Sequence, residues 1–387
     1  MPAQSWLFIN RSVFKKRFGF SPAGCGAIAR PIKQDWKDAV PTFDHNQLLN
    51  FSEQLLVTGG MPAGDAALVA KLLVKADLRG YAGHGVTRIP SYLSWIKDGT
   101  INLGTGIEIE HESKISAVIE GNHTIGQVAA TAAMNLAIKK AREHGTGIVC
   151  LRHASHTGRL ADYMEMAAEA GLIGMGAVSV GAGSTTLYGG MERITGTNPI
   201  AFGIPARNGQ HIILDFATAA MSMGEIQKRV ARRETIPEGV MLDGHGQPTS
   251  DFKVFRGPPR GVFLPFGGYK GSGLALMTEI LGGILTGNGL GSDWWTRGGH
   301  GVNGVFLQAI AVEEFQPLEQ FFDKVEQLVA LVKSARPAPG YNEILLPGEN
   351  ARRTEAKQLK EGVAIDEATW AKLQQLAATL DVAPPRG

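Results

Sequence analysis

The sequence predicts an α+β protein in which helices from both ends of the chain form one unit around a central sheet domain. Three observations predict this class. Strand-like and helix-like segments alternate from 115 to 315, both flanks carry apolar residues at helical spacing, and the dinucleotide fingerprint G-x-G-x-x-G is missing. We expect an extension over 1–40, for which disorder is an option, a helix-rich outer unit over 41–114 and 316–387, and a mixed domain over 115–315.

The N-terminal flank begins with two helices, over 45–60 and 64–80, each ended by glycine. In the centre, periodicity predicts strands over 115–121, 146–152, 172–180, 209–218 and 305–313, and helices over 126–145, 158–171 and 270–287. The C-terminal flank is helical again, over 318–335 and 366–380. Because no linker separates these regions, we expect the two flanks to pack together.

Composition limits the classes of function. Of the 387 residues, 44% are hydrophobic and 19% are charged, which is typical of a globular protein with a sizeable core. A net charge of +2 gives no concentrated basic field for nucleic acid, and no apolar run is long enough to span a membrane. We therefore expect neither nucleic acid nor membrane as a partner.

The first 34 residues contain six basic residues and no acid, whereas the rest of the chain has 32 basic residues, the 38 less these six, against 36 acids. This composition fits an organelle transit peptide or a non-functional extension. The chain has two cysteines, Cys25 and Cys150, so no disulfide framework is available. A reducing cytoplasm fits this cysteine content.

The stretch "DLRGYAGHGVTRIPSY" places His84, Arg88 and Tyr92 four residues apart, with Pro90 suited to the first turn of a helix. Two interpretations compete. One is an ordinary loop before a surface helix. The other is a site where arginine holds a carboxylate with its planar fork while the imidazole moves a proton near pH 7.

Other stretches have both a structural and a functional interpretation. "GGYKGSG" places Lys270 before a helix N-terminus, as a phosphate-binding turn or as a solvated lysine in a glycine turn. "RHASHTGRL" places His156 and Arg159 between a strand and a helix, suited to a pyrophosphate or nicotinamide or simply structural. The stretch also contains His153, but no carboxylate at ligand spacing supports a metal site at His153 and His156. Asp215 and Glu225, taken singly, are explained as caps or surface acids.

Six motifs in order resemble the malate/L-lactate dehydrogenase family of the non-Rossmann type, which includes sulfolactate, ureidoglycolate and 2,3-diketogulonate dehydrogenases and piperideine-2-carboxylate reductases. They are "DLRGYAGHGVTRIPSY", "RHASHTGRLADYMEMAAEAGLIGMG", "GTNPIAFGIP", "LDFATAAMSMGEI", "PFGGYKGSGLALMTEILGGILTG" and "PAPGYNEILLPGE", and the resemblance spans Phe43 to Ala378. It implies a mostly antiparallel sheet in a cofactor-binding domain over 115–315, a homodimer, and NAD or NADP in an unusual pocket.

The resemblance also implies roles for single residues. His84 matches the proton donor and Arg88 the anchor of the substrate carboxylate. His156 lies by the nicotinamide or takes the proton-transfer role instead. Tyr92 and Thr197 match substrate contacts, and Glu225 matches an acid of a proton relay. The implied cofactor-binding residues are His156, Thr157, Gly158, Arg159, Leu160, Asn198, Asp215, Phe216, Ala217, Lys270, Gly271, Pro347, Gly348 and Glu349.

Two positions depart from the family pattern. Gly83 stands where the family has a serine before the histidine, so a relay through that hydroxyl cannot operate here. Glu225 stands where the imine-reducing members have aspartate. Both departures bear on which acid or imine the protein would reduce.

We expect an NAD(P)H-dependent oxidoreductase that interconverts a small 2-oxo acid and a 2-hydroxy acid. The alternatives are reduction of a cyclic imine carboxylate and, from another class, a non-catalytic protein that binds the cofactor; a metal-dependent hydrolase is disfavoured. The implied cofactor residues at 347–349 form a loop late in the chain, which we call the late loop. Arg352 and Arg353 follow it, and they favour NADP over NAD because either cation suits a 2′-phosphate.

Overall fold

The computed structural model describes residues 41–104, 106–181, 183–231, 233–296 and 302–385. The chain divides into two units, Val40–Ala335 with Ile344–Gly387, and Met1–Ala39 with Arg336–Glu343. Every element described below belongs to the larger unit. The expectation for 1–40 lies outside the described residues.

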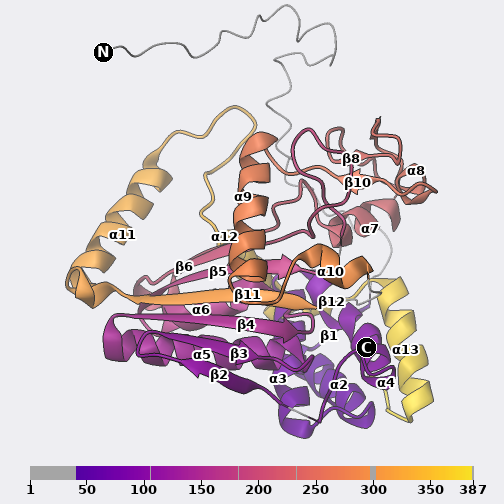
Figure 1. Ribbon diagram of the computed structural model, residues 1–387, viewed down its shortest axis with the longest axis horizontal. Helices are drawn as coiled ribbons and strands as arrows, with labels where there is room; N and C mark the ends of the chain where they lie inside the picture. Colours follow the sequence, from indigo (N-terminus) through magenta and orange to yellow (C-terminus); the bar gives the residue numbers. More distant parts are fainter. Residues whose placement is uncertain (1–40, 105, 182, 232, 297–301, 386–387) are drawn as a thin grey trace, which may run out of the picture. The chain divides into compact units, whose positions relative to one another are not determined.

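A seven-stranded sheet forms the centre of the larger unit (Figure 1). Its order is β2-β3-β4-β11-β5-β6-β7, and only β3 and β4 pair in parallel. The expected mostly antiparallel mixed sheet is thus confirmed. The strands are β2 (Glu108–Glu112), β3 (Ser116–Glu120), β4 (Thr146–Ala154), β5 (Leu172–Val180), β6 (Ile200–Ile204), β7 (Ile212–Phe216) and β11 (Asn303–Ala311).

Helices α5 (Gly126–His144) and α6 (Leu160–Glu169) cover one face of this sheet (Figure 1). Their alanine-rich faces bury a core with β4, β5 and β11, and glycines in the strands let α6 lie close. A Cβ on Gly203, for example, would lie 2.4 Å from the Met164 carbonyl oxygen. On the other face, α9 (Tyr269–Glu279) continues into a π-helical turn, Ile280–Ile284.

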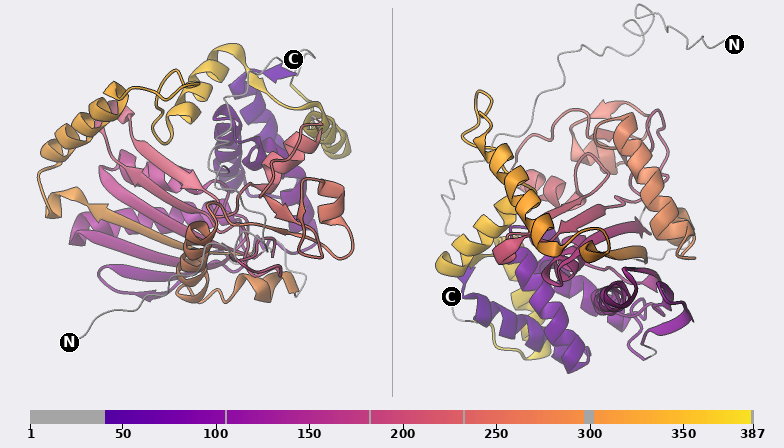
Figure 2. Two further views of the ribbon diagram at one scale, coloured as in Figure 1. Left: turned by 90° about the horizontal axis from the view of Figure 1, so that it is seen from above. Right: turned by 90° about the vertical axis from the view of Figure 1, so that its left-hand side faces the viewer.

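A second core joins the two ends of the chain. Helices α2 (His45–Thr58), α3 (Ala63–Leu78), α4 (Ile89–Lys97) and α13 (Glu367–Leu380) share it with the short strands β1 (Thr42–Phe43) and β12 (Val363–Ala364). Figure 2 shows the first and last helices side by side. Asp44 and Asp366 cap the first turns of α2 and α13 with their carboxylates.

The remaining elements lie outside these two cores. The polar helix α12 (Glu349–Glu361) follows the late loop, and α11 (Leu318–Ser334) has one buried residue, Val325. A small third core lies among the loops that follow β7. The other elements are α7 (Met223–Ala231), α8 (Phe252–Arg256), α10 (Gly291–Thr296), β8 (Met241–Leu242), β9 (Pro248–Thr249) and β10 (Val262–Phe263). Among the described residues, no helix has the length and hydrophobicity of a membrane span.

Candidate active site

A buried carboxylate holds the turn that carries the first histidine. Asp77, at the end of α3, is 5% exposed, and its Oδ2 accepts a hydrogen bond from the Val86 amide at 2.7 Å. The turn passes so close that a Cβ on Gly85 would lie 1.9 Å from Asp77 Oδ1. The contact between Asp77 and Gly85 therefore fixes the two 3-10 turns that flank Gly85, Ala82–His84 and Val86–Arg88.

Four predicted residues meet beside this turn. The rings of His84 and His156 stack with centroids 5.4 Å apart and planes 9° apart. Tyr92, on α4, places its hydroxyl oxygen 2.7 Å from His156 Nδ1. Arg88 Nε donates to the Gly83 carbonyl at 2.6 Å, and within the described part of the chain its two terminal guanidinium nitrogens have no hydrogen bond or ion pair. We call these four residues, His84, Arg88, Tyr92 and His156, the histidine site.

Both imidazoles are neutral at neutral pH. Burial, reinforced by the charges of Arg88 and Arg159, lowers the pKa of His84 to about 3. Burial, followed by Arg88 and His84, lowers the pKa of His156 well below its usual value. His84 Nδ1 is buried and has no hydrogen-bond partner among the residues that the structure describes. A buried polar nitrogen without a partner indicates a group that the site is built to receive.

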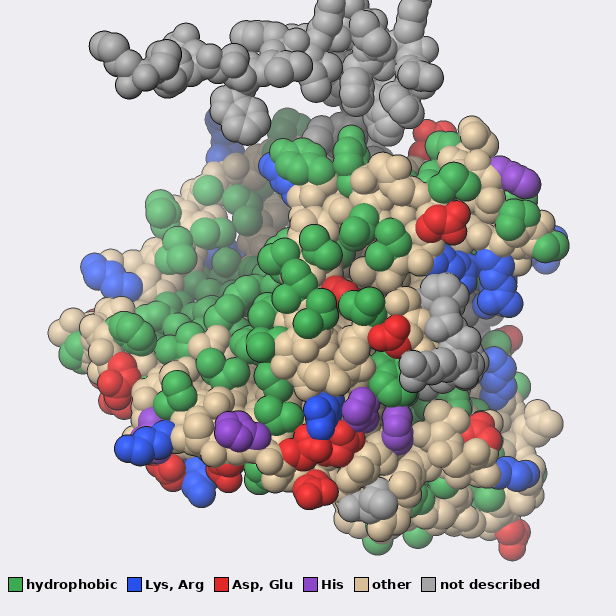
Figure 3. Space-filling model, in the orientation of Figure 1, with side chains coloured by type: hydrophobic (Ala, Val, Ile, Leu, Met, Phe, Trp, Pro, Cys, Tyr) green, Lys and Arg blue, Asp and Glu red, His purple; other side chains and the backbone are tan. Residues whose placement is uncertain are grey.

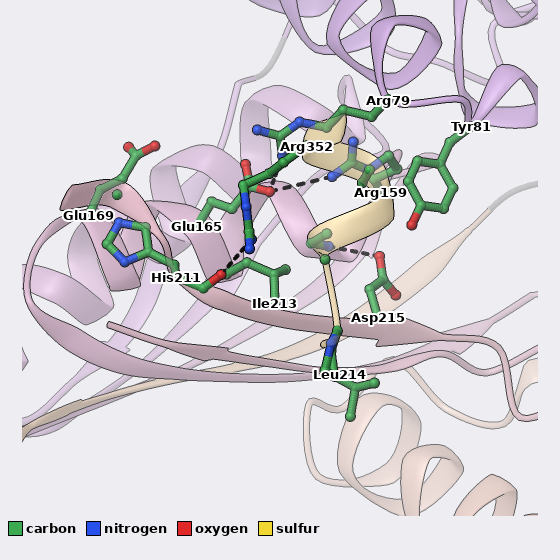
Figure 4. A pocket seen from close by; sticks show the side chains of 15 residues that line it. Arg79, Tyr81, Arg159, Glu165, Glu169, His211, Ile213, Leu214, Asp215 and Arg352 are labelled. Carbon is green, nitrogen blue, oxygen red and sulfur yellow. Dashed lines mark hydrogen bonds and ion pairs between the residues drawn. The ribbon is translucent and has the colours of Figure 1, made fainter. Parts of the chain in front are cut away.

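A second cluster of predicted residues lines a pocket of about 230 Å³ (Figure 4). Its lining includes Arg79, Tyr81, Arg159, Asp215, Pro347, Gly348 and Arg352, which we call the arginine pocket. Arg159 is 5% exposed and lies 4.8 Å above the Tyr81 ring, and two of its nitrogens, Nε and Nη1, find no hydrogen-bond partner in the described ranges. Buried guanidinium donors in a pocket fit an anionic group, such as the pyrophosphate of a dinucleotide.

The late loop reaches this pocket by pairing with the edge of the sheet. The Ile213 amide, on β7, donates to the Pro347 carbonyl at 3.3 Å, and Gly348 turns the chain with φ +82°. Asp215, at the end of β7, accepts a hydrogen bond from the Ala161 amide at 2.8 Å. Burial raises the pKa of Asp215 to about 6. The strand end and the late loop, about 130 residues apart in sequence, thus form one wall.

An ion-pair network that the sequence did not reveal supports the pocket. Glu165, on α6, pairs with Lys75 at 2.7 Å and also with Arg79, and Arg79 in turn pairs with Glu355 at 2.9 Å. The network joins α3, α6 and α12. Arg79 and Tyr81 lie inside the "DLRGYAGHG" motif, but their partners are far away in sequence, and no local pattern identifies them.

Other predicted residues lie away from the pocket lining. Asn198 is fully buried, where its amide donates to Glu279 at 2.6 Å and its oxygen accepts from the Val180 amide at 3.1 Å. Lys270 is exposed in the first turn of α9. Glu349 pairs with Lys333 and Arg353, each at 2.5 Å. We interpret the side chains of Asn198 and Glu349 as supports of the loops beside them.

The implied cofactor-binding residues that follow His156, and those at the end of β7 and the start of α9, also have structural contacts. The Thr157 carbonyl accepts from the Tyr163 hydroxyl at 2.5 Å, and Leu160 belongs to the sheet core. Gly158 has φ +74°, and a Cβ on Gly271 would lie 1.9 Å from the Phe266 carbonyl oxygen. Phe216 lies edge-on against Phe266, with ring centroids 5.2 Å apart, which joins the end of β7 to the turn before α9. Ala217, the next residue along the chain, is half-buried.

The two remaining predictions concern a substrate contact and a relay acid. Thr197 is half-buried, and its carbonyl accepts from the Thr218 amide at 2.9 Å. Glu225 pairs with Arg229 at 3.1 Å, with its side chain 41% exposed. Its neighbour Gly224 does reach the histidine turn, since a Cβ on Gly83 would lie 3.6 Å from Gly224 Cα. That distance is an ordinary contact, so a serine Cβ would fit at residue 83.

Known proteins are similar to this chain along most of its length. The sequence matches the family described as malate/L-lactate dehydrogenase over residues 43–374. It is 36% identical over 351 residues to a malate dehydrogenase of Pyrococcus abyssi, covering 87% of this chain and 94% of that one. It is 38% identical over 330 residues to an L-sulfolactate dehydrogenase of Methanocaldococcus jannaschii, covering 83% and 92%.

The fold agrees as well. The solved structure of a malate dehydrogenase from Pyrococcus horikoshii OT3 superposes with a TM-score of 0.82 at 34% identity, over 89% of this chain and 97% of that one. The expected resemblance is confirmed over nearly the whole described chain. This chain therefore belongs to the malate/L-lactate dehydrogenase family and is an oxidoreductase that acts on CH–OH groups with a nicotinamide cofactor.

Proposed function

We propose that this enzyme interconverts a small 2-oxo acid and its 2-hydroxy acid, with Arg88 binding the substrate carboxylate and His84 moving the proton. One observation carries the assignment of roles: the His84 ring stacks on that of His156 and lies four residues before Arg88, of which only Nε is hydrogen-bonded among the described residues. A carboxylate next to a carbonyl needs that combination of a fixed cation and a proton-transfer group.

Arg88 is oriented by its own backbone. Because Nε is bonded to the Gly83 carbonyl at 2.6 Å, the guanidinium presents its two terminal nitrogens end-on. This geometry suits the two oxygens of one carboxylate. The substrate would then be held with its reacting carbon toward the imidazoles.

His84 rests in the form that oxidation needs. With a pKa of about 3, it is neutral at pH 7 and can accept the proton of a hydroxyl group. For reduction it must first be protonated. A bound carboxylate would neutralise Arg88 and so remove one cause of the low pKa, which couples proton uptake on His84 to substrate binding. The nicotinamide, when bound, supplies or accepts the hydride.

The arginine pocket is our proposed cofactor site, with a preference for NADP. Arg352 lines the pocket and donates to the His211 carbonyl at 2.7 Å, while the described residues give it no ion pair with a carboxylate. Such a cation suits a 2′-phosphate. Arg353 instead pairs with Glu349. Arg352→Ala should raise KM for NADPH about tenfold and leave KM for NADH within about twofold, the loss of one charge-assisted hydrogen bond. Equal KM values for the two cofactors in the unaltered enzyme would remove the preference.

A substrate panel tests the reaction. We would follow cofactor absorbance with pyruvate, oxaloacetate, 2,3-diketogulonate and piperideine-2-carboxylate, each with NADH and with NADPH. We expect turnover with at least one 2-oxo acid. Turnover with the cyclic imine alone would replace the 2-oxo acid as substrate. Tight NADPH binding without any turnover would instead support a non-catalytic cofactor-binding protein.

We also propose that the enzyme is a cytoplasmic homodimer. Apolar side chains gather over α9 and the adjoining sheet face, coloured green in Figure 3, and the exposed ones on α9 and its π-helical turn include Leu276, Met277, Ile280 and Ile284. Helix α11 exposes Leu328 and Leu331. Exposed apolar areas of this kind support association. Light scattering should give twice the chain mass, and Leu328→Glu with Leu331→Glu should shift it to the monomer, whereas Gln327→Glu on the same helix should not. Cell fractionation checks the compartment.

A further inference from the structure

Tyr92 has a single hydrogen-bond partner. Its ring lies on α4 and is 2% exposed, and its hydroxyl oxygen is 2.7 Å from His156 Nδ1. Among the described residues, no second donor or acceptor for this hydroxyl is found. The family resemblance implies a substrate contact for Tyr92, and the structure adds the contact of its hydroxyl with His156.

The direction of this hydrogen bond follows from counting protons. A neutral phenol has one O–H, and burial raises the pKa of Tyr92 above its usual value, so the phenol keeps that proton. If His156 Nδ1 carried a hydrogen and donated it to the phenol oxygen, the phenol hydrogen would be buried without an acceptor. Leaving a buried donor unsatisfied costs about 1–3 kcal/mol. The phenol is therefore the donor and Nδ1 the acceptor.

We propose that Tyr92 is a positioning residue that holds His156 as the tautomer protonated on Nε2, so that His156 donates a hydrogen bond to the substrate oxygen and only His84 can take up the proton. The reason lies in the nitrogen lone pairs. A neutral imidazole has one, and in His156 it faces Tyr92. Nε2 then carries a hydrogen and cannot act as a base.

The groups around His156 favour the same state. The titratable or charged groups that face it are His84, stacked at 5.4 Å, Arg88, and Tyr92 itself. Neither Arg88 nor a protonated His84 would tolerate a second cation beside it. His84 differs from His156 in one respect, since its Nδ1 is buried without a partner. His84 therefore takes up the proton and His156 donates a hydrogen bond, and this assignment of roles rests on the function proposed above.

The test reads the nitrogens directly and does not depend on turnover. The full chain, labelled with ¹⁵N-histidine, is measured by NMR without substrate, and the signals of His156 are assigned by their loss in His156→Gln. We expect His156 to be protonated on Nε2 and unprotonated on Nδ1. In Tyr92→Phe, which keeps the ring and removes the hydroxyl, we expect a mixture of the two tautomers.

Tyr163→Phe is the matched control. Tyr163 is 1% exposed, and its hydroxyl donates to the Thr157 carbonyl at 2.5 Å, so this substitution also removes a buried phenol hydrogen bond but leaves His156 untouched. It should lower stability by a similar amount and leave the His156 nitrogen pattern as in the unaltered protein. Melting temperatures of both variants show that each is folded.

Kinetics add a second readout. Removing the donor destabilises neutral His156 and raises its pKa, so Tyr92→Phe should move the acid limb of the kcat/KM profile to higher pH and lower kcat about tenfold, with KM within about twofold. Tyr163→Phe should leave the acid limb in place. His156 protonated on Nδ1 in the unaltered protein, or a nitrogen pattern unchanged in Tyr92→Phe, would overturn the proposal. If no acid or imine is turned over, the proposed function fails, while the nitrogen signals still decide the tautomer.

Discussion

The histidine site and the arginine pocket treat buried charge in opposite ways. In the histidine site, the charge of Arg88 acts on both imidazoles and that of Arg159 on His84, and among the described residues no carboxylate makes an ion pair or hydrogen bond with either ring. In the arginine pocket, Arg159 lies 3.6 Å from both Asp162 and Glu165, and Arg79 pairs with Glu165 and Glu355. One region excludes charge from its imidazoles, and the other balances several charges against one another.

The difference matches two tasks. A proton-transfer group must exist in both protonation states near the working pH, and burial beside Arg88 makes the charge of His84 depend on what binds. A group that holds an anionic cofactor needs a charge that never changes, which arginine provides. Residues of the histidine site should therefore affect rate or substrate binding, and residues of the arginine pocket should affect cofactor binding.

Removing the proposed proton carrier should have the largest effect. His84→Ala should lower kcat and kcat/KM together by about a hundred- to ten-thousand-fold, the usual range for a general acid or base, with melting temperature as the folding control. His156→Ala should weaken cofactor binding if His156 seats the nicotinamide. Loss of turnover in His156→Ala with normal cofactor binding, together with an active His84→Ala, would reverse the two roles.

Removing the carboxylate anchor should come next. Arg88→Ala should raise KM for the acid substrate about ten- to a hundredfold with a smaller change in kcat, because a charge-assisted pair also binds the ground state. Arg88→Lys keeps the charge but loses the fork, and should fall between. Arg256→Ala, which removes an arginine stacked on Phe252 of α8 at 5.0 Å, is the control. An unchanged KM in Arg88→Ala, measured by initial rates, would assign the carboxylate to another residue.

Asp215, in the arginine pocket, should make the free energy of unfolding depend on pH. Burial raises the pKa of Asp215 from 3.8 to about 6, so the folded protein holds this proton where the unfolded chain has lost it. The free energy of unfolding therefore falls as pH rises from about 4 to 6, by about 2 kcal/mol. Asp215→Asn should remove this loss and raise the melting temperature at pH 7.5 but not at pH 3.5. Equal shifts at both pH values would show that Asp215 is already ionised with little cost.

The departure at residue 83 should have the smallest effect. A Cβ on Gly83 meets only Gly224 Cα at 3.6 Å, so Gly83→Ser should change the free energy of unfolding by about 0.5 kcal/mol or less and turnover of 2-oxo acids only a few-fold. Gly85→Ser, two residues away, is the contrast, because its Cβ would collide with Asp77. A large gain with the cyclic imine in Gly83→Ser would show that the hydroxyl relay matters for that substrate.

Periodicity predicted the elements that bury one apolar stripe or run. α3, α5, β5 and β11 lie within a few residues of their expected positions, because each packs against a core that its own spacing describes. α12 was not predicted since its sequence, "ENARRTEAKQLKE", has no apolar repeat. β2, fully exposed at the sheet edge, and β6, five residues ending before Pro205, carry too little pattern to stand out.

The site shows the same division. His84, Arg88 and His156 were found because their motifs are local, and the structure brings them together. The bond between Tyr92 and His156 joins residues 64 apart, and the pair of Arg79 with Glu165 joins residues 86 apart. Such partners are set by the packing of α4 and α3 against the loop and helix after β4, which one sequence does not encode locally.

One paired titration tests most directly whether different residues bind the cofactor and transfer the proton. NADPH binding is measured by calorimetry for the unaltered enzyme, Arg159→Gln and His84→Ala, with turnover recorded on the same samples. We expect Arg159→Gln to weaken NADPH binding about tenfold or more, because a charge-assisted contact is lost. We expect His84→Ala to keep the Kd for NADPH within about twofold and to lose turnover. An unchanged Kd in Arg159→Gln, or an equal loss of binding in both variants, would contradict this expectation.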